Sequence, residues 1–130
     1  MPLDTRITAL AQAVGLDVKQ LQSAIAALEK QDKKVALAGT TITPADAGLF
    51  TKAITGPTAL SVSAVPASPV VTSFILELTG GGTGVTFWPG IKWPGGTAPT
   101  LTASGRDVLG FYTHDGGASW VGLILGKDVL

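Results

Sequence analysis

The last third of this chain is a series of aromatic residues separated at short intervals by glycine and proline, and this pattern limits the fold most. Five of the eight aromatic residues lie between Phe87 and Tyr112, and Trp120 is a sixth. Glycine and proline interrupt helices and are frequent in the tight turns that join short strands. The sequence His114-Asp115-Gly116-Gly117 predicts one such turn, because glycine supplies the positive φ that a hairpin needs. We therefore expect a compact domain of short strands in this region.

The composition describes a neutral, apolar chain. Nine basic and nine acidic residues give 130 residues a net charge of zero. Charged residues make up 14 % of the chain, against about 25 % in an ordinary soluble domain. The mean hydropathy is +0.41, but no apolar run approaches the roughly 20 residues of a membrane span. We expect self-association to cover apolar surface, with no membrane insertion and, for want of a basic stripe, no nucleic-acid partner.

The N-terminus and the cysteine content indicate where the chain is made. The segment Met1–Arg6 lacks the basic and apolar regions of a signal peptide, so we expect synthesis and folding in a cytoplasm without secretion by that route. The chain contains no cysteine, which excludes a disulfide scaffold and a thiolate metal site.

Residues 3–34 carry the spacing of a coiled-coil helix. Apolar residues recur at intervals of four and three, which is the heptad pattern of a narrow seam; they are Leu3, Ile7, Leu10, Val14, Val18, Leu21, Ile25 and Leu28. The interval from Val14 to Val18 is a stutter, which locally unwinds a left-handed coiled coil. We therefore predict that residues 1–34 form an N-terminal helical stem that joins several copies of the chain.

A second interpretation divides this segment into two short helices. Gly15 could end the first helix, and Asp17 with Gln20 could form a capping box at the start of the second. Both helices would then pack on a globular core. The narrow apolar stripe favours the continuous stem, since core packing needs a wider face. In the continuous stem, Ile and Val at heptad position a with Leu at position d would by themselves favour a two-stranded coiled coil.

Beyond the stem, the sequence predicts a connecting segment, residues 35–57, and an all-β domain, residues 58–130. Thr43-Pro44 could begin a single helical turn within residues 45–52. Strand-like runs then follow at short spacing; they are residues 59–65, 70–78, 85–88, 107–113 and 120–125. We expect a sandwich or jelly-roll-like domain, which places the whole chain in the α+β class with mainly β structure.

The run 70–78 is fairly apolar on both of its alternating faces. One face would carry Val70, Thr72, Phe74, Leu76 and Leu78, and the other would carry Val71, Ser73, Ile75 and Glu77. Such a strand is expected either to be buried on both sides or to lie at a subunit interface.

The polar residues do not form a recognisable catalytic or metal-binding pattern. His114 is the only histidine, and Asp115 is the only acidic residue beside it. The run Gly80–Gly84 lacks the Lys-Ser/Thr that follows the glycines of a phosphate-binding loop. The remaining carboxylates are scattered, whereas a glycosidase needs two that face each other across a cleft. We therefore expect a protein without enzymatic activity, cofactor or metal.

Four aromatic side chains are candidates for ligand contact. Trp88, Trp93, Tyr112 and Trp120 could stack on the sugar rings of a host glycan, since Trp and Tyr combine an apolar ring with a polar group. The alternative is that they pack in the core or between subunits, where aromatic rings supply most of the buried area of a small β domain.

The C-terminal segment resembles a pattern that recurs at the C-termini of tailed-phage virion proteins, chiefly tail-fibre and other fibre-like or surface proteins. It consists of Ile91-Lys92-Trp93-Pro94-Gly95-Gly96-Thr97-Ala98-Pro99-Thr100-Leu101-Thr102, Asp107-Val108-Leu109, Phe111-Tyr112-Thr113, Asp115-Gly116-Gly117, Trp120 and Gly126-Lys127-Asp128. Residues 6–15 and 17–21 also resemble helical segments of such proteins. Residues 35–84 resemble no family that we can name.

The resemblance implies a homotrimeric virion component without enzymatic activity. Its partners would be further copies of itself and other tail, baseplate or capsid proteins, and a host-surface glycan if it takes part in attachment. A short tail fibre or baseplate component is the expected role, and a head fibre or capsid decoration protein is the alternative. The expected location is the virion, after synthesis in the host cytoplasm.

Overall fold

The computed structural model describes residues 33–130 together with six helical residues nearer the N-terminus, which are Thr5, Arg6, Ala9, Gln20, Gln22 and Ile25. The chain divides into two compact units, Met1–Gln31 and Asp32–Leu130. Apart from Ile25, the heptad residues of the predicted stem lie outside the described residues, as does the break predicted by the two-helix alternative. The coiled-coil stem therefore stays a prediction.

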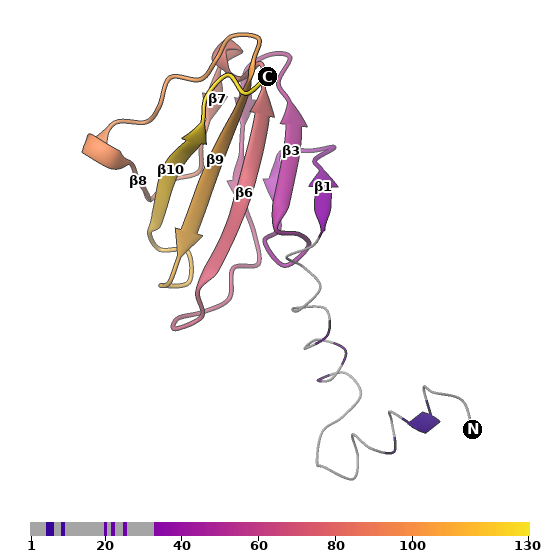
Figure 1. Ribbon diagram of the computed structural model, residues 1–130. Coiled ribbons are helices and arrows are strands. Elements are labelled where there is room, and N and C mark those ends of the chain that lie inside the picture. The colour runs from indigo at the N-terminus through magenta and orange to yellow at the C-terminus, as the bar shows by residue number, and fades with distance from the viewer. Residues whose placement is uncertain (1–4, 7–8, 10–19, 21, 23–24, 26–32) are drawn as a thin grey trace. The chain divides into compact units, whose positions relative to one another are not determined.

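The second unit is built from short strands and two 3-10 turns (Figure 1). The strands are β1 (Lys34–Ala36), β2 (Thr41–Ile42), β3 (Leu49–Ala53), β4 (Thr58–Ala59), β5 (Ser61–Val62), β6 (Thr72–Thr79), β7 (Val85–Thr86), β8 (Ile91–Lys92), β9 (Arg106–Thr113) and β10 (Trp120–Gly126). The 3-10 turns are η2 (Gly81–Thr83) and η3 (Pro94–Gly96).

Six of these strands form one mixed sheet in the order β1-β3-β6-β9-β10-β8 (Figure 1). The central strands β6, β9 and β10 are antiparallel neighbours. Strand β3 is parallel to both β1 and β6, and β8 is parallel to β10. A parallel pair requires a crossover connection, and the connections to β3 and β6 carry the short strands β2, β4 and β5.

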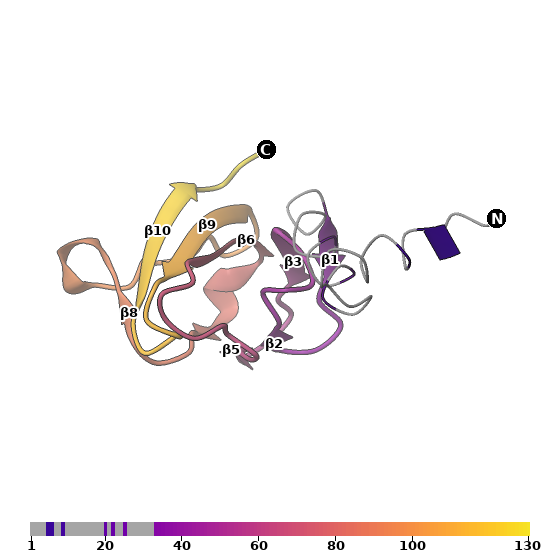
Figure 2. The same ribbon diagram turned by 90° about the horizontal axis from the view of Figure 1, so that it is seen from below.

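These short strands make a second layer over one face of the sheet. Strand β2 pairs with β5, and β4 pairs with β7; Figure 2 shows β2 and β5 beneath the arc of the large sheet. Only Leu60 separates β4 from β5, so one extended segment pairs with both β7 and β2. The Leu60 amide donates to the Thr86 carbonyl at 2.8 Å, and the next amide, of Ser61, donates to the Thr40 carbonyl at 2.9 Å.

The core lies between these two layers and follows the alternation of the central strands. On β6, Thr72, Phe74, Leu76 and Leu78 are buried, and each lies opposite a buried residue of β9 in the antiparallel register, in turn Thr113, Phe111, Leu109 and Asp107. Alternate residues point to one face of a strand, so this register places the buried set on one face, which we call the inner face.

An aromatic cluster occupies the centre of the inner face. The ring of Phe74 lies 5.5–5.8 Å, between centroids, from the rings of Phe111, Trp88 and Trp120, and 5.6 Å from Phe50. Trp88 lies 4.7 Å from Phe111. Edge-to-face and tilted pairs at these separations are favourable beyond their buried area. The aromatic residues that dominate the sequence therefore hold the two layers together.

The structure confirms the mainly β class and corrects its details. A jelly-roll-like domain would be antiparallel, whereas five of the strand pairs named above are parallel. Residues 35–57 are not a connecting segment, because β1, β2 and β3 lie within it and two of them enter the large sheet; the β unit begins at Asp32 rather than at residue 58. The helical turn predicted within residues 45–52 is wrong, since Phe50 enters the core from a strand.

Candidate functional site: an apolar sheet face and an aromatic groove

The outer face of the large sheet carries a row of apolar residues that crosses four strands. Leu49 on β3 pairs with Ile75 on β6, Ile75 pairs with Gly110 on β9, and Gly110 pairs with Leu123 on β10. Ile75 is 39 % exposed and Leu123 is 40 % exposed. We call these four residues the apolar row. The sequence indicated it only through Ile75, because the partners come from distant strands.

Further apolar side chains widen this row on the β9 and β10 side. Leu125 is 56 % exposed, and a Cβ atom added to Gly110 would lie 3.2 Å from Leu125 Cδ1, so the Leu125 side chain covers the space that Gly110 leaves open. Tyr112 is 40 % exposed on the same face and pairs with Val121. The outer face of an antiparallel sheet exposed to water is normally polar, whereas this part of the outer face is apolar.

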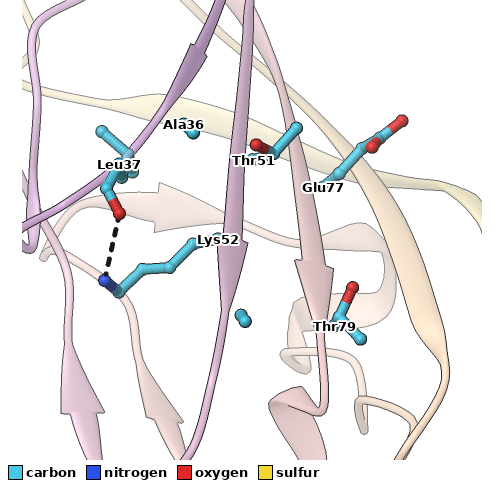
Figure 3. A pocket seen from close by; sticks show the side chains of 7 residues that line it. Ala36, Leu37, Thr51, Lys52, Glu77 and Thr79 are labelled. Carbon is cyan, nitrogen blue, oxygen red and sulfur yellow. Dashed lines mark hydrogen bonds between the residues drawn. The ribbon is translucent and has the colours of Figure 1, made fainter.

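Polar residues border the apolar row toward the ends of β3 and β6. A shallow pocket of about 250 Å³ is lined here by Ala36, Leu37, Thr51, Lys52, Ala53, Glu77 and Thr79. Figure 3 shows Glu77 and Thr51 on neighbouring strands, and Lys52 reaching to the other side, where its Nζ donates to the Leu37 carbonyl at 3.5 Å. Arg106 on β9 pairs with Thr79. This border therefore carries both an acid and a base.

Two of the four predicted glycan-contact residues are core residues. Trp88 is 7 % exposed and Trp120 is 2 % exposed, so neither offers a ring face to a sugar, and the core-packing alternative applies to both. The indole Nε1 of Trp88 is buried without a hydrogen-bond partner among the described residues. Its surroundings are aromatic rings, with Trp120 in a T-shaped arrangement at 5.7 Å. Tyr112 lies on the outer face of the sheet, so for this residue the alternative to glycan contact is packing between subunits.

Trp93 differs from the other two tryptophans because it is only partly buried and lines a groove. This groove of about 270 Å³ is bounded by Trp93, Pro94, Thr97, Pro99, Thr100, Ile124 and Lys127. It lies between β10 and the loop that follows β8, and that loop projects away from the sheet (Figure 1). We call it the Trp93 groove. Trp93 could be identified from the sequence, but Thr97 and Thr100 of the same loop and Lys127, which follows β10, were not predicted as site residues.

Asp107 is a fully buried carboxylate with a structural role. It accepts hydrogen bonds from the Thr102 amide at 2.6 Å, the Thr102 hydroxyl at 2.7 Å and the Asp128 amide at 2.9 Å. Burial acts to raise the pKa of Asp107, but these hydrogen bonds and the charge of Lys127 outweigh it, and the pKa is lowered. Asp107 thus fixes the loop before β9 and the C-terminal segment to the sheet.

Asp115 organises the predicted hairpin turn between β9 and β10. The Asp115 carboxylate accepts hydrogen bonds from the Ser119 hydroxyl at 2.6 Å and the Ser119 amide at 2.9 Å, and the Thr113 hydroxyl lies 2.9 Å away. These contacts lower the pKa of Asp115 to about 2. Gly116 and Gly117 have φ of 73° and 87°, as the turn requires. His114 is exposed beside it. These hydrogen bonds account for Asp115 as a turn residue.

Within the described part of the chain, no three His, Cys, Asp or Glu side chains gather where a metal ion could bind. The described residues also include no helix with the length and apolar character needed to cross a membrane. The chain matches no family model, no curated protein and no solved structure.

Proposed function

We propose that this chain is a non-enzymatic structural protein of a tailed-phage virion, a homotrimeric fibre-like appendage such as a short tail fibre or baseplate component. Its copies associate through the apolar row on the outer face of the sheet. Its action is assembly, with adhesion to the host as a second role. A head fibre or capsid decoration protein is the alternative position on the virion.

The observation that carries this proposal is the uncovered apolar row. Leu49, Ile75 and Leu123 lie in register in a row that crosses four strands; Ile75 and Leu123 are exposed, and Leu49 is partly buried. Contiguous exposed apolar surface on a folded protein marks an interaction site. A second copy is the occupant that we favour, because the face is bordered by both an acid, Glu77, and a base, Arg106, and the chain as a whole has zero net charge.

The low charge of the chain supports association with itself rather than with a charged partner. With 14 % charged residues, copies repel each other weakly, and the cores of subunit interfaces are depleted of charge. The predicted N-terminal stem would align the copies independently. The threefold symmetry and the virion location come from the resemblance of residues 85–128 to phage proteins.

The first test is the mass of the full chain in solution by light scattering. Three copies of 13.1 kDa give about 39 kDa. Leu123→Lys places a charge in the apolar row and should shift the mass toward the monomer. Ala59→Lys, on the exposed surface of the other layer, is the matched control and should leave the mass unchanged. A wild-type chain that stays monomeric at all concentrations would disprove the proposal.

A second test isolates the sheet face from the stem. Because the chain contains no cysteine, a single Ile75→Cys thiol reports directly on this face. We expect a maleimide to modify it at least tenfold more slowly in the assembly than in a dilute monomer, whereas Ala59→Cys reacts at one rate in both. Equal rates for Ile75→Cys would place the interface elsewhere.

The virion location is tested on intact particles of the phage that encodes the chain. An antibody against residues 85–130, detected by gold particles in the electron microscope, should label the tail or baseplate. Label on the capsid would select the head-fibre or decoration alternative. Particles without label anywhere would contradict a virion role.

A further inference from the structure

We infer that the Trp93 groove is a binding site for an acidic sugar residue, a hexuronate of a surface polysaccharide. This inference does not rest on the oligomer proposed above. Ile124, which lines the groove, pairs with the core residue Leu109, whereas Leu123 of the apolar row lies on the alternate face of β10. One copy could therefore associate with others and bind a ligand at the same time.

The indole of Trp93 is fixed as a rigid platform. Its centroid lies 5.2 Å from the ring of Phe87 and 5.7 Å from that of Phe111, in T-shaped arrangements. A Cβ atom on Gly122 would lie 2.7 Å from Trp93 Cζ3, so only glycine lets the ring approach β10 this closely. An aromatic ring held in place loses little entropy when a sugar ring stacks on it.

The loop that forms the other wall is also preorganised. The Gly96 amide donates to the Trp93 carbonyl at 2.9 Å, and Pro94 begins the turn that this bond closes. Pro99 restricts the backbone further along the loop. At about 270 Å³ the groove is slightly smaller than the roughly 300–1,000 Å³ of typical small-molecule sites, which limits the ligand to one or two sugar rings.

The polar groups of the groove define the charge of the ligand. Thr97 and Thr100 supply hydroxyls that can both donate to and accept from sugar hydroxyls. Among the residues that the structure describes, Lys127 is the only charged one that lines the groove, and its side chain is exposed. The Asp107 carboxylate is close enough for its pKa to be affected by Lys127, but Asp107 is fully buried and already accepts three hydrogen bonds. The Lys127 ammonium therefore favours an anionic ligand. A sugar ring that carries a carboxylate can stack on Trp93 and also place its negative charge near Lys127.

The test uses the full chain labelled with ¹⁵N and short oligogalacturonates as the probe. The three tryptophans give three indole N–H signals. We expect the Trp93 signal to shift on titration and the signals of buried Trp88 and Trp120 to stay in place. The fully methyl-esterified oligomer, which keeps the rings but lacks the charge, should bind at least tenfold more weakly.

Lys127→Gln provides the variant that retains the fold, because the side chain is exposed. Loss of one charge-assisted hydrogen bond should weaken binding of the acidic oligomer about tenfold and abolish the preference over the ester. Lys92→Gln, an exposed lysine on β8 outside the groove, is the matched control and should bind like the wild type. Absence of any shift at Trp93, or equal affinity for acid and ester, would overturn the inference.

Discussion

The two faces of the six-stranded sheet use neighbouring residues of the same strands, yet only the inner face is covered within the β unit. On β6, Phe74 is 3 % exposed and the next residue, Ile75, is 39 % exposed. The inner face packs against the short ladders through an aromatic cluster, while the outer face carries the apolar row. Apolar side chains lie on both faces, and the outer face also carries the polar residues Glu77, Thr79 and Arg106, so the clearest difference between the faces is the covering layer.

One copy of the chain therefore leaves the apolar side chains of Ile75, Leu123 and Leu125 exposed. A sheet with one solvated face normally alternates apolar and polar residues. Here a substitution on the inner face should act on the folding of each chain, and the matching substitution on the outer face should act on association. Comparing pairs of neighbouring positions separates the two effects.

Phe74→Ala should have the largest effect. Its ring lies within 6 Å, between centroids, of four other aromatic rings, and truncation of a buried Phe costs about 3–5 kcal/mol because a cavity remains. Denaturant unfolding of the dilute monomer should show this loss in the free energy of unfolding. A loss below about 1 kcal/mol would mean that the two layers are not held by this cluster.

Asp107→Asn should have the second-largest effect on the free energy of unfolding. The variant to compare it with is Glu77→Gln, on the outer face of the adjacent strand. The Asn side chain cannot accept all three hydrogen bonds of Asp107, and bonds to a charged group contribute roughly 1.5–3 kcal/mol each, so we expect a loss of about 3 kcal/mol. Glu77→Gln should change stability by about 0.5 kcal/mol or less. Equal losses at both positions would contradict the structural role of Asp107.

A glycine on each face gives a third comparison. A methyl group at Gly122 would lie 2.7 Å from Trp93, 2.9 Å from Ile91 and 3.0 Å from Phe111, so Gly122→Ala should cost about 1–3 kcal/mol through overpacking. At Gly110 the nearest neighbour is the exposed Leu125 side chain, which can move. Gly110→Ala should therefore be neutral or should stabilise the strand by about 0.5 kcal/mol. Thermal unfolding of both variants in parallel would show the opposite signs.

The central strands could be predicted from the sequence, because β6, β9 and β10 are runs of seven or eight residues rich in β-branched and aromatic side chains and are separated by turn residues. The parallel pairing of β1 and β3 could not be predicted. Short runs such as Lys34–Ala36 contain no information on direction, and the choice of partner depends on contacts between distant segments. The stem remains a prediction from its heptads.

The candidate site shows the same limit at two tryptophans that are each followed by Pro-Gly. Trp88 and Trp93 each begin the sequence Trp-Pro-Gly, so local sequence treats them alike. The fold buries Trp88 beneath β6 and β9 residues, whereas Trp93 lies at the edge of the core beside the projecting loop. The groove could be found only when Lys127 and Ile124 were placed beside Trp93 by the fold.

Asp115 makes the stability of the hairpin turn depend on pH. Its folded pKa of about 2 lies below the ordinary 3.8, so its contribution is complete above pH 3.8 and is lost as the pH falls toward 2. The pKa of Asp107 is also lowered, so protonation of Asp107 at low pH should reduce stability as well. Asp115→Asn should flatten the pH dependence of unfolding in this window. A profile identical to that of the wild type would contradict the turn hydrogen bonds.

Leu125→Ser should have the smallest effect on the fold of one chain and a clear effect on assembly. The side chain is 56 % exposed and covers Gly110 without closing a core, so the free energy of unfolding of the dilute monomer should change by about 0.5 kcal/mol or less. Because Leu125 borders the apolar row, the same change should raise the concentration at which copies associate, as measured by analytical ultracentrifugation. If unfolding changed and association did not, the outer face would belong to the folding core of the single chain, and the distinction between the two faces would be lost.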